Sequence, residues 1–159
     1  MISPFCVSRN SGLQVDGVNH LVPVDYDNPS GDKTLLKDKT VSLQRLQERM
    51  EDKNSLVNLC IIDACRENPF TSETRALASG LAAATAPAGT LLAFATSAGT
   101  VASDGRGANG LYTENLVTHM MQPAKDLEKM MKDVSRDVRK ETRDKQKPWC
   151  VRSLPDATL

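Results

Sequence analysis

The chain has no surplus of charge of either sign and only two histidines. Lysine and arginine together number 20, as do aspartate and glutamate, so no overall field would draw the protein to nucleic acid or to an anionic membrane. The four cysteines form no C-x-x-C pair, and neither His20 nor His119 lies near one in sequence. These spacings indicate neither a zinc site nor a disulfide framework, and we expect no metal and no cofactor.

Signals for export and membrane insertion are also missing. The start, Met1 to Cys6, has no basic region followed by a long apolar stretch, so we expect a cytoplasmic protein with reduced thiols. Residues 76–103 carry no charge, but glycine, proline and hydroxyl residues interrupt them. This composition favours a loop leading into a buried strand over a membrane span. A length of 159 residues is that of one domain.

Apolar patterns predict alternating strands and helices. Residues 56–62 and 90–96 are nearly continuous apolar runs, typical of strands covered on both faces of a parallel sheet. The expected elements are a strand at 18–24, a helix at 40–50 with Thr40 as its cap, strands at 56–62 and 90–96, helices at 111–121 and after Pro123, and a closing segment from Pro148, the residue that ends the preceding helix. This order predicts an α/β fold.

The carboxyl ends of the two apolar strands carry the candidate site. Ligands of open α/β sheets bind at such ends, and here Asp63 and Asp104 lie in the two loops that follow. Cys65 comes just after the first strand, where its sulfur can face a cleft and Arg66 favours the thiolate. The alternative is a small core residue, which is also our interpretation of Cys60 inside the apolar run.

Asp63-Ala64-Cys65-Arg66 resembles the nucleophile motif of the caspase superfamily, in which classical caspases read Q-A-C-[RQG]-G. Further segments are similar to the bacterial-type and paracaspase branch, and the resemblance runs from about Gly12 to Leu154. These segments are 12–17, 21–25, 67–70, 95–96, 99–105, 109–113 and 146–149. The resemblance implies a mostly parallel sheet flanked by helices and a cysteine endopeptidase with Cys65 as its nucleophile.

The acid two residues before the cysteine implies a substrate class. Metacaspases and paracaspases carry acid there and cut after arginine or lysine. By resemblance, Asp63 and Asp104 would bind that basic side chain of a peptide or protein substrate. The alternative for Asp63 is a strand-end residue that bonds nearby backbone.

The general base is the part of the family pattern that this chain departs from. The family histidine lies in a G-H-G motif, and counting back from Pro23-Val24-Asp25 puts its position at Ser11. Serine cannot replace imidazole near neutral pH. Gly12 is retained, and in the family its backbone N–H joins that of the cysteine in the oxyanion hole. We expect His20, inside the next strand, and His119, late in a helix, to be structural.

The start of the chain does not follow the family. We therefore divide the sequence into an atypical segment, 1–11, and the later part of a caspase-like domain, 12–159. A sheet lacking the family's first strands would leave exposed edges prone to association, either with a second copy or with a related caspase-like chain. Three functions follow: an impaired cysteine endopeptidase, an inactive homologue that binds partners, or an ordinary α/β domain with an inert thiol.

Overall fold

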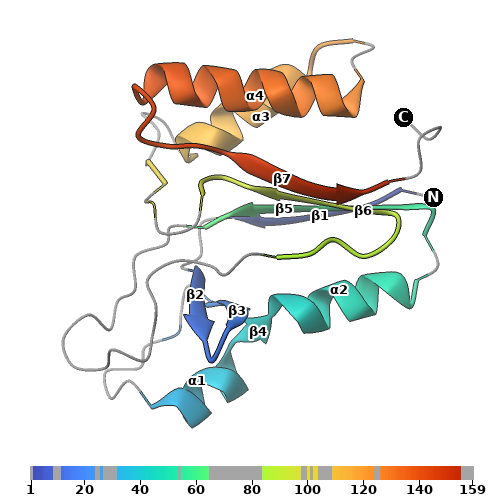
Figure 1. Ribbon diagram of the computed structural model, residues 1–159, viewed down its shortest axis with the longest axis vertical. Coiled ribbons are helices and arrows are strands. Elements are labelled where there is room, and N and C mark those ends of the chain that lie inside the picture. Colours follow the sequence, from blue (N-terminus) through green and yellow to red (C-terminus); the bar gives the residue numbers. More distant parts are fainter. Residues whose placement is uncertain are drawn as a thin grey trace.

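In the computed structural model, a four-stranded sheet lies between two layers of helices (Figure 1). The structure describes residues 2–8 by their backbone, and residues 12–23, 26, 32–53, 55–64, 84–97, 100, 102–103, 109–123 and 126–154. None of the helices in these ranges is long and apolar enough to cross a membrane.

The central sheet has the strand order β1-β5-β6-β7. Its strands are β1 (Ile2–Ser8), β5 (Val57–Asp63), β6 (Thr90–Phe94) and β7 (Trp149–Ser153). β1, β5 and β6 run parallel, and β7 pairs with β6 antiparallel. The two apolar runs thus form neighbouring parallel strands, and the predicted mostly parallel sheet is confirmed.

Both faces of the sheet are covered, which is why its central strands β5 and β6 are mostly apolar. Successive side chains of a strand point to opposite faces. Ile61, Leu91 and Ala93 pack in one cluster with residues of the helices above the sheet in Figure 1 (the upper layer). Ile62 and Leu92 pack in another cluster with residues of the elements below it (the lower layer). Cys60 belongs to the lower cluster and is fully buried, so its interpretation as a core residue is confirmed.

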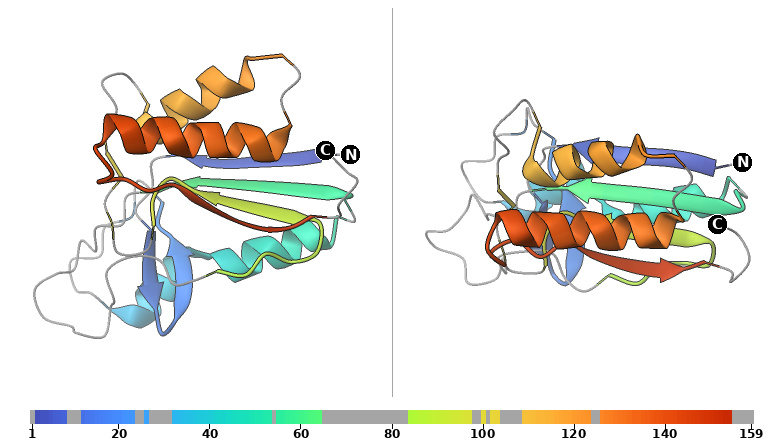
Figure 2. Two further views of the ribbon diagram at one scale, coloured as in Figure 1. Left: turned by 45° about the horizontal axis from the view of Figure 1, so that its top comes forward. Right: turned by 90° about the horizontal axis from the view of Figure 1, so that it is seen from above.

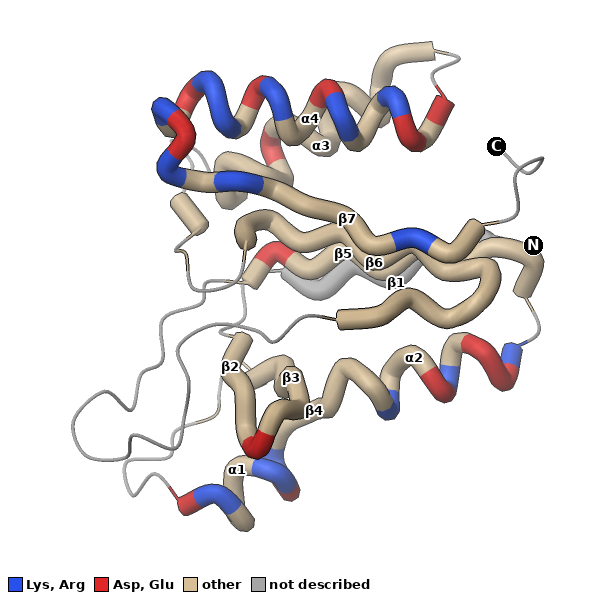
Figure 3. The backbone as a smooth tube through the Cα atoms, in the orientation of Figure 1, with Lys and Arg blue, Asp and Glu red and all other residues tan. Residues whose placement is uncertain are grey.

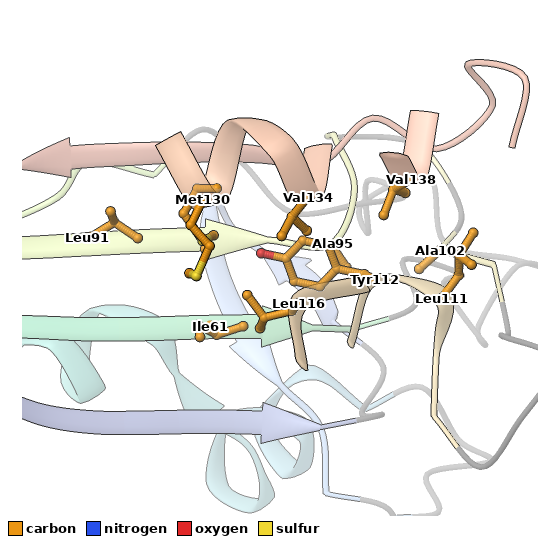
Figure 4. Close-up of a cluster of buried hydrophobic side chains, with 12 residues drawn as sticks. Ile61, Leu91, Ala95, Ala102, Leu111, Tyr112, Leu116, Met130, Val134 and Val138 are labelled. Atoms are coloured by element: carbon orange, nitrogen blue, oxygen red, sulfur yellow. The ribbon is translucent and has the colours of Figure 1, made fainter. Parts of the chain in front are cut away.

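The upper layer consists of α3 (Leu111–Met120) and α4 (Leu127–Glu141), which lie on the same side of the sheet (Figure 2). A stripe of α4 faces the sheet through its buried residues Met130, Met131, Val134 and Val138. In Figure 4, the Tyr112 ring of α3 lies close to Ala95 and Val134. Charges of both signs alternate along the rest of α4 (Figure 3), as the amphipathic pattern predicted.

The end of α4 differs from the prediction. We expected Pro148 to end this helix, but the helix ends at Glu141 and is capped by Thr142. Arg143 and Asp144 then adopt left-handed backbone conformations with φ of 52° and 61°. A turn, rather than the proline, therefore separates α4 from β7.

The lower layer begins with a hairpin that the sequence analysis did not predict. β2 (Gly12–Val15) pairs antiparallel with β3 (Val18–Leu21). Asp16 and Gly17 connect them with φ of 49° and 83°, as a two-residue turn of this type requires. An Asp-Gly pair between short apolar stretches is a strong sequence signal for a hairpin, so the sequence was sufficient to predict this one.

Two helices complete the lower layer, α1 (Lys33–Lys39) and α2 (Leu43–Glu51), with the short β4 (Val41–Ser42) between them. Thr40, predicted to cap the helix at 40–50, instead ends α1. The N-cap of α2 is Ser42, whose hydroxyl accepts the N–H of Arg45. The helix therefore starts later than predicted, and the residues before it form a strand.

The segment 1–11 contributes a strand for which the sequence analysis made no prediction. Residues 2–8 pair with β5 over its full length, from Ile2 beside Val57 to Ser8 beside Asp63. Within the described part of the chain, β1 has a partner strand on this side only. Residues 2–8 of the atypical segment are thus part of the central sheet.

Candidate functional site

Three parallel strands end side by side at one edge of the sheet. Ser8, the last residue of β1, pairs with Asp63, the last residue of β5. Ile62 of β5 pairs with Phe94, the last residue of β6. Because the carboxyl ends of parallel strands share an edge, the segments that follow them start from neighbouring points. Ser11 follows β1 and Cys65 follows β5, but both residues, like Asp104, lie outside the described residues.

Asp63 is buried at this edge, with 6 % of its surface exposed. Its Oδ2 accepts a hydrogen bond of 2.5 Å from the Thr113 hydroxyl in the first turn of α3. Asp63 thus contacts a helix far along the chain, whereas the sequence-based alternative was a bond to nearby backbone. Among the residues that the structure describes, none donates a hydrogen bond to Asp63 Oδ1.

The N-terminus of α3 is built to receive this carboxylate. Gly110 is the N-cap, and it has no side chain to bond the first helical N–H groups. A Cβ on Gly110 would lie only 2.9 Å from Asp63 Oδ2. The Asp63 carboxylate therefore sits where a capping side chain would otherwise be, and its negative charge is favourable at this positive end of the helix dipole.

We expect Gly110→Ala to destabilise the fold by about 1–2 kcal/mol, because the new methyl group would displace the buried Asp63 carboxylate from Thr113. The backbone of Gly110, with φ of −63°, is one that alanine adopts freely, so strain is not the cause. Chemical denaturation measures the change in free energy of unfolding. In an Asp63→Ala background the same substitution should cost much less, and an equal cost in both backgrounds would contradict this explanation.

His20 is a buried structural residue of β3. Its Nδ1 lies 2.8 Å from the Thr40 hydroxyl, which donates its own proton to the Leu36 carbonyl at 2.6 Å. Since the hydroxyl has one proton, His20 Nδ1 is the donor. Burial, helped by the charge of Lys37, lowers the pKa of His20 and keeps the ring neutral. The prediction that His20 is a structural residue inside a strand is confirmed.

His119 is also engaged within the fold. It is buried in α3, and its Nε2 lies 2.8 Å from Asp137 Oδ2 of α4. The hydrogen bond from His119 is the main cause that lowers the pKa of Asp137. The pair links the two upper helices, so the structural interpretation of His119 is confirmed as well.

The segment after β6 is fastened to the turn that follows α4. The Ser97 hydroxyl donates to the Lys147 carbonyl at 2.8 Å, and the Ser103 N–H donates to Gln146 Oε1 at 2.9 Å. Beside it, Trp149 stacks on Phe94 with ring centroids 4.8 Å apart. This stacking covers part of the half-buried Trp149 ring. Sequence reasoning assigned no role to Thr113 or Gln146, since no local pattern indicates a partner so distant in the chain.

Gly12, predicted to supply an oxyanion N–H, is the buried first residue of β2 and pairs with Leu21. Across the described ranges, no group of three His, Cys, Asp or Glu side chains is placed to hold a metal ion.

Comparisons with known proteins agree on one fold. Residues 9–159 match the family described as Caspase domain (Peptidase_C14). The structure is similar to a crystal structure of caspase-1 from Spodoptera frugiperda, with a TM-score of 0.54 and 15% identity over 76% of this chain and 57% of that chain. It is also similar to a structure of pro-sf-caspase-1, with a TM-score of 0.53 and 17% identity over 74% and 55% of the two chains. The chain thus spans little more than half the length of these structures. A search of curated proteins finds no match.

Proposed function

Because this chain belongs to the caspase domain family, we propose that it is a cysteine-type endopeptidase domain slowed by a serine at the position of the catalytic histidine. The register of β1 and β5, with Ser8 beside Asp63, carries the proposal. The segments that follow these strands contain Ser11 and Cys65. The residue at the position of the base and the nucleophile therefore each come after a strand, and the two strands end at the same edge of the sheet.

The reaction needs two proton transfers. The Cys65 thiol loses its proton and its sulfur attacks the substrate carbonyl carbon, while the N–H groups of Gly12 and Cys65 stabilise the oxyanion. The amine then leaves with a proton, and water hydrolyses the thioester. An imidazole exchanges these protons near neutral pH, whereas the Ser11 hydroxyl does not. Turnover by this chain is therefore slow.

Asp63 supports a preference for arginine or lysine before the scissile bond, as in the metacaspase and paracaspase branch that the sequence resembles. Thr113 orients this buried carboxylate through Oδ2. Oδ1 has no donor among the described residues, and we assign it to pair with a guanidinium or ammonium group. Asp104 is the second carboxylate that we assign to this basic side chain. A reduced thiol fits a cytoplasmic location.

An arginyl peptide substrate tests the proposal. We expect slow cleavage by the natural chain, no cleavage by Cys65→Ala, and unchanged cleavage by Cys150→Ala, a matched control at an exposed cysteine. Cleavage that survives in Cys65→Ala would overturn the assignment of the nucleophile.

An inactive homologue that binds a second copy or a related caspase-like chain is the second candidate. It is favoured by Ser11 at the histidine position and by the outer edge of β1. Within the described segments, β1 pairs with β5 on one side and has no partner strand on the other. A stable dimer in analytical ultracentrifugation, together with no cleavage even by Ser11→His, would support this candidate against the peptidase.

A further inference from the structure

Gln146 is an uncharged polar residue in the interior, with 1 % of its surface exposed. A buried amide must satisfy both its donor and its acceptor. Gln146 Nε2 donates to the Ala95 carbonyl, just after β6, at 2.8 Å, and its Oε1 accepts the Ser103 N–H at 2.9 Å. One side chain therefore fastens two backbone points of the segment that leaves the sheet at the candidate site.

The turn after α4 is shaped to present this side chain. Arg143 and Asp144 occupy the left-handed region that side chains with a Cβ disfavour. The Asp144 N–H bonds the Arg139 carbonyl at 2.7 Å, and the Asp144 carboxylate pairs with Arg139 Nε at 2.7 Å, which holds the turn in place. The Gln146 N–H bonds the Thr142 hydroxyl at 3.1 Å. The backbone of Gln146 is thus fixed independently of its amide.

A chain of contacts leads from Gln146 to Asp63. The Ser103 N–H is held by Gln146, and the Ser103 carbonyl accepts the N–H of Leu111, the first residue of α3, at 3.3 Å. That first turn of α3 also contains Thr113, which bonds Asp63. The position of the helix end against the carboxylate therefore depends on where Ser103 is held.

We propose that Gln146 is a positioning residue for the cation-binding carboxylate, acting through Ser103 and the first turn of α3 on Asp63. The inference rests on the proposed function, since it assigns Asp63 to the basic side chain of the substrate. Without the amide, the backbone after β6 loses both bonds, the α3 N-terminus shifts, and Asp63 no longer meets the guanidinium at the same place.

The test compares Gln146→Met, which keeps the length of the side chain and removes both hydrogen bonds, with Val57→Ala. Val57 is buried at the opposite end of β5, so its truncation destabilises the fold without touching this chain of contacts. The first measurement is amide hydrogen exchange over residues 95–111. We expect faster exchange there in Gln146→Met and no local change in Val57→Ala.

The second measurement is binding of two peptides that differ only in arginine or citrulline, with Cys65→Ala present in every chain so that no turnover is needed. We expect Gln146→Met to reduce the preference for arginine by about tenfold or more, and Val57→Ala to leave it unchanged. Faster exchange with an unchanged preference, or unchanged exchange, would overturn the positioning role. If Cys65→Ala alone does not distinguish the peptides, the proposed basic specificity fails, and the exchange result still decides whether Gln146 holds this backbone.

Discussion

Ser11→His is expected to raise kcat/KM for an arginyl peptide by about 10²-fold or more, because a positioned general base contributes about 10²–10⁴-fold to such reactions. The pairing of Ser8 with Asp63 brings the strand before Ser11 level with the strand before Cys65. An imidazole at residue 11 would therefore act from the same edge as the thiol. The rate should rise with pH around the ordinary pKa of histidine, about 6.5.

Two controls separate this gain from an indirect effect. Ser11→Ala should cleave as slowly as the natural chain, since the hydroxyl takes no part in proton transfer. The double variant with Ser11→His and Cys65→Ala should be inactive. A Ser11→His chain that is folded and no faster than Ser11→Ala would contradict the assignment of residue 11 as the base position.

Asp63→Asn, made in the Ser11→His chain, is expected to lower kcat/KM for an arginyl peptide by about 10²-fold relative to its citrulline counterpart, because a charge-assisted pair becomes a neutral contact. Asparagine keeps the shape of the side chain beside Gly110 and can still accept the Thr113 hydroxyl. The readout is the ratio of kcat/KM for the two peptides. This ratio reports substrate specificity, and it would not change if the role of Asp63 were purely structural.

Asp16→Asn provides the matched control. Asp16 is an exposed carboxylate in the β2–β3 turn, where hydrogen bonds from Lys37 and Lys33 lower its pKa. Removing its charge should not alter the ratio. If Asp63→Asn also leaves the ratio unchanged and only lowers the free energy of unfolding, Asp63 is an anchor for α3 and not a substrate-binding residue.

Local pattern was sufficient for the elements with the strongest apolar signals. The runs at 56–62 and 90–96 predicted β5 and β6 because both faces of each strand are covered, so nearly every side chain is apolar. The helical stripe after Pro123 predicted the buried face of α4 for a similar reason. The Asp16-Gly17 turn is also a local signal, and it is sufficient to indicate the β2–β3 hairpin.

Local pattern was not sufficient for β1 or for the ends of helices. Ile2–Ser8 forms a strand through its pairing with β5, and a short segment containing Pro4 has no periodicity that predicts such a partner. The start of α2 was misplaced because Thr40 and Ser42 are both plausible caps by type. The choice between them depended on Thr40 bonding Leu36 and His20.

The amino-acid sequence by itself determined the class of the fold, the family, and the place of Asp63 at the end of an apolar strand with Cys65 two residues later, because these depend on residue type and spacing along one segment. Only the tertiary structure decided that Ser8 ends beside Asp63, that Thr113 and Gly110 receive its carboxylate, and that Gln146 holds Ser103. Each of these contacts joins residues roughly 40 to 55 positions apart in the chain, and the energy of such a contact depends on how the strands and helices between them pack.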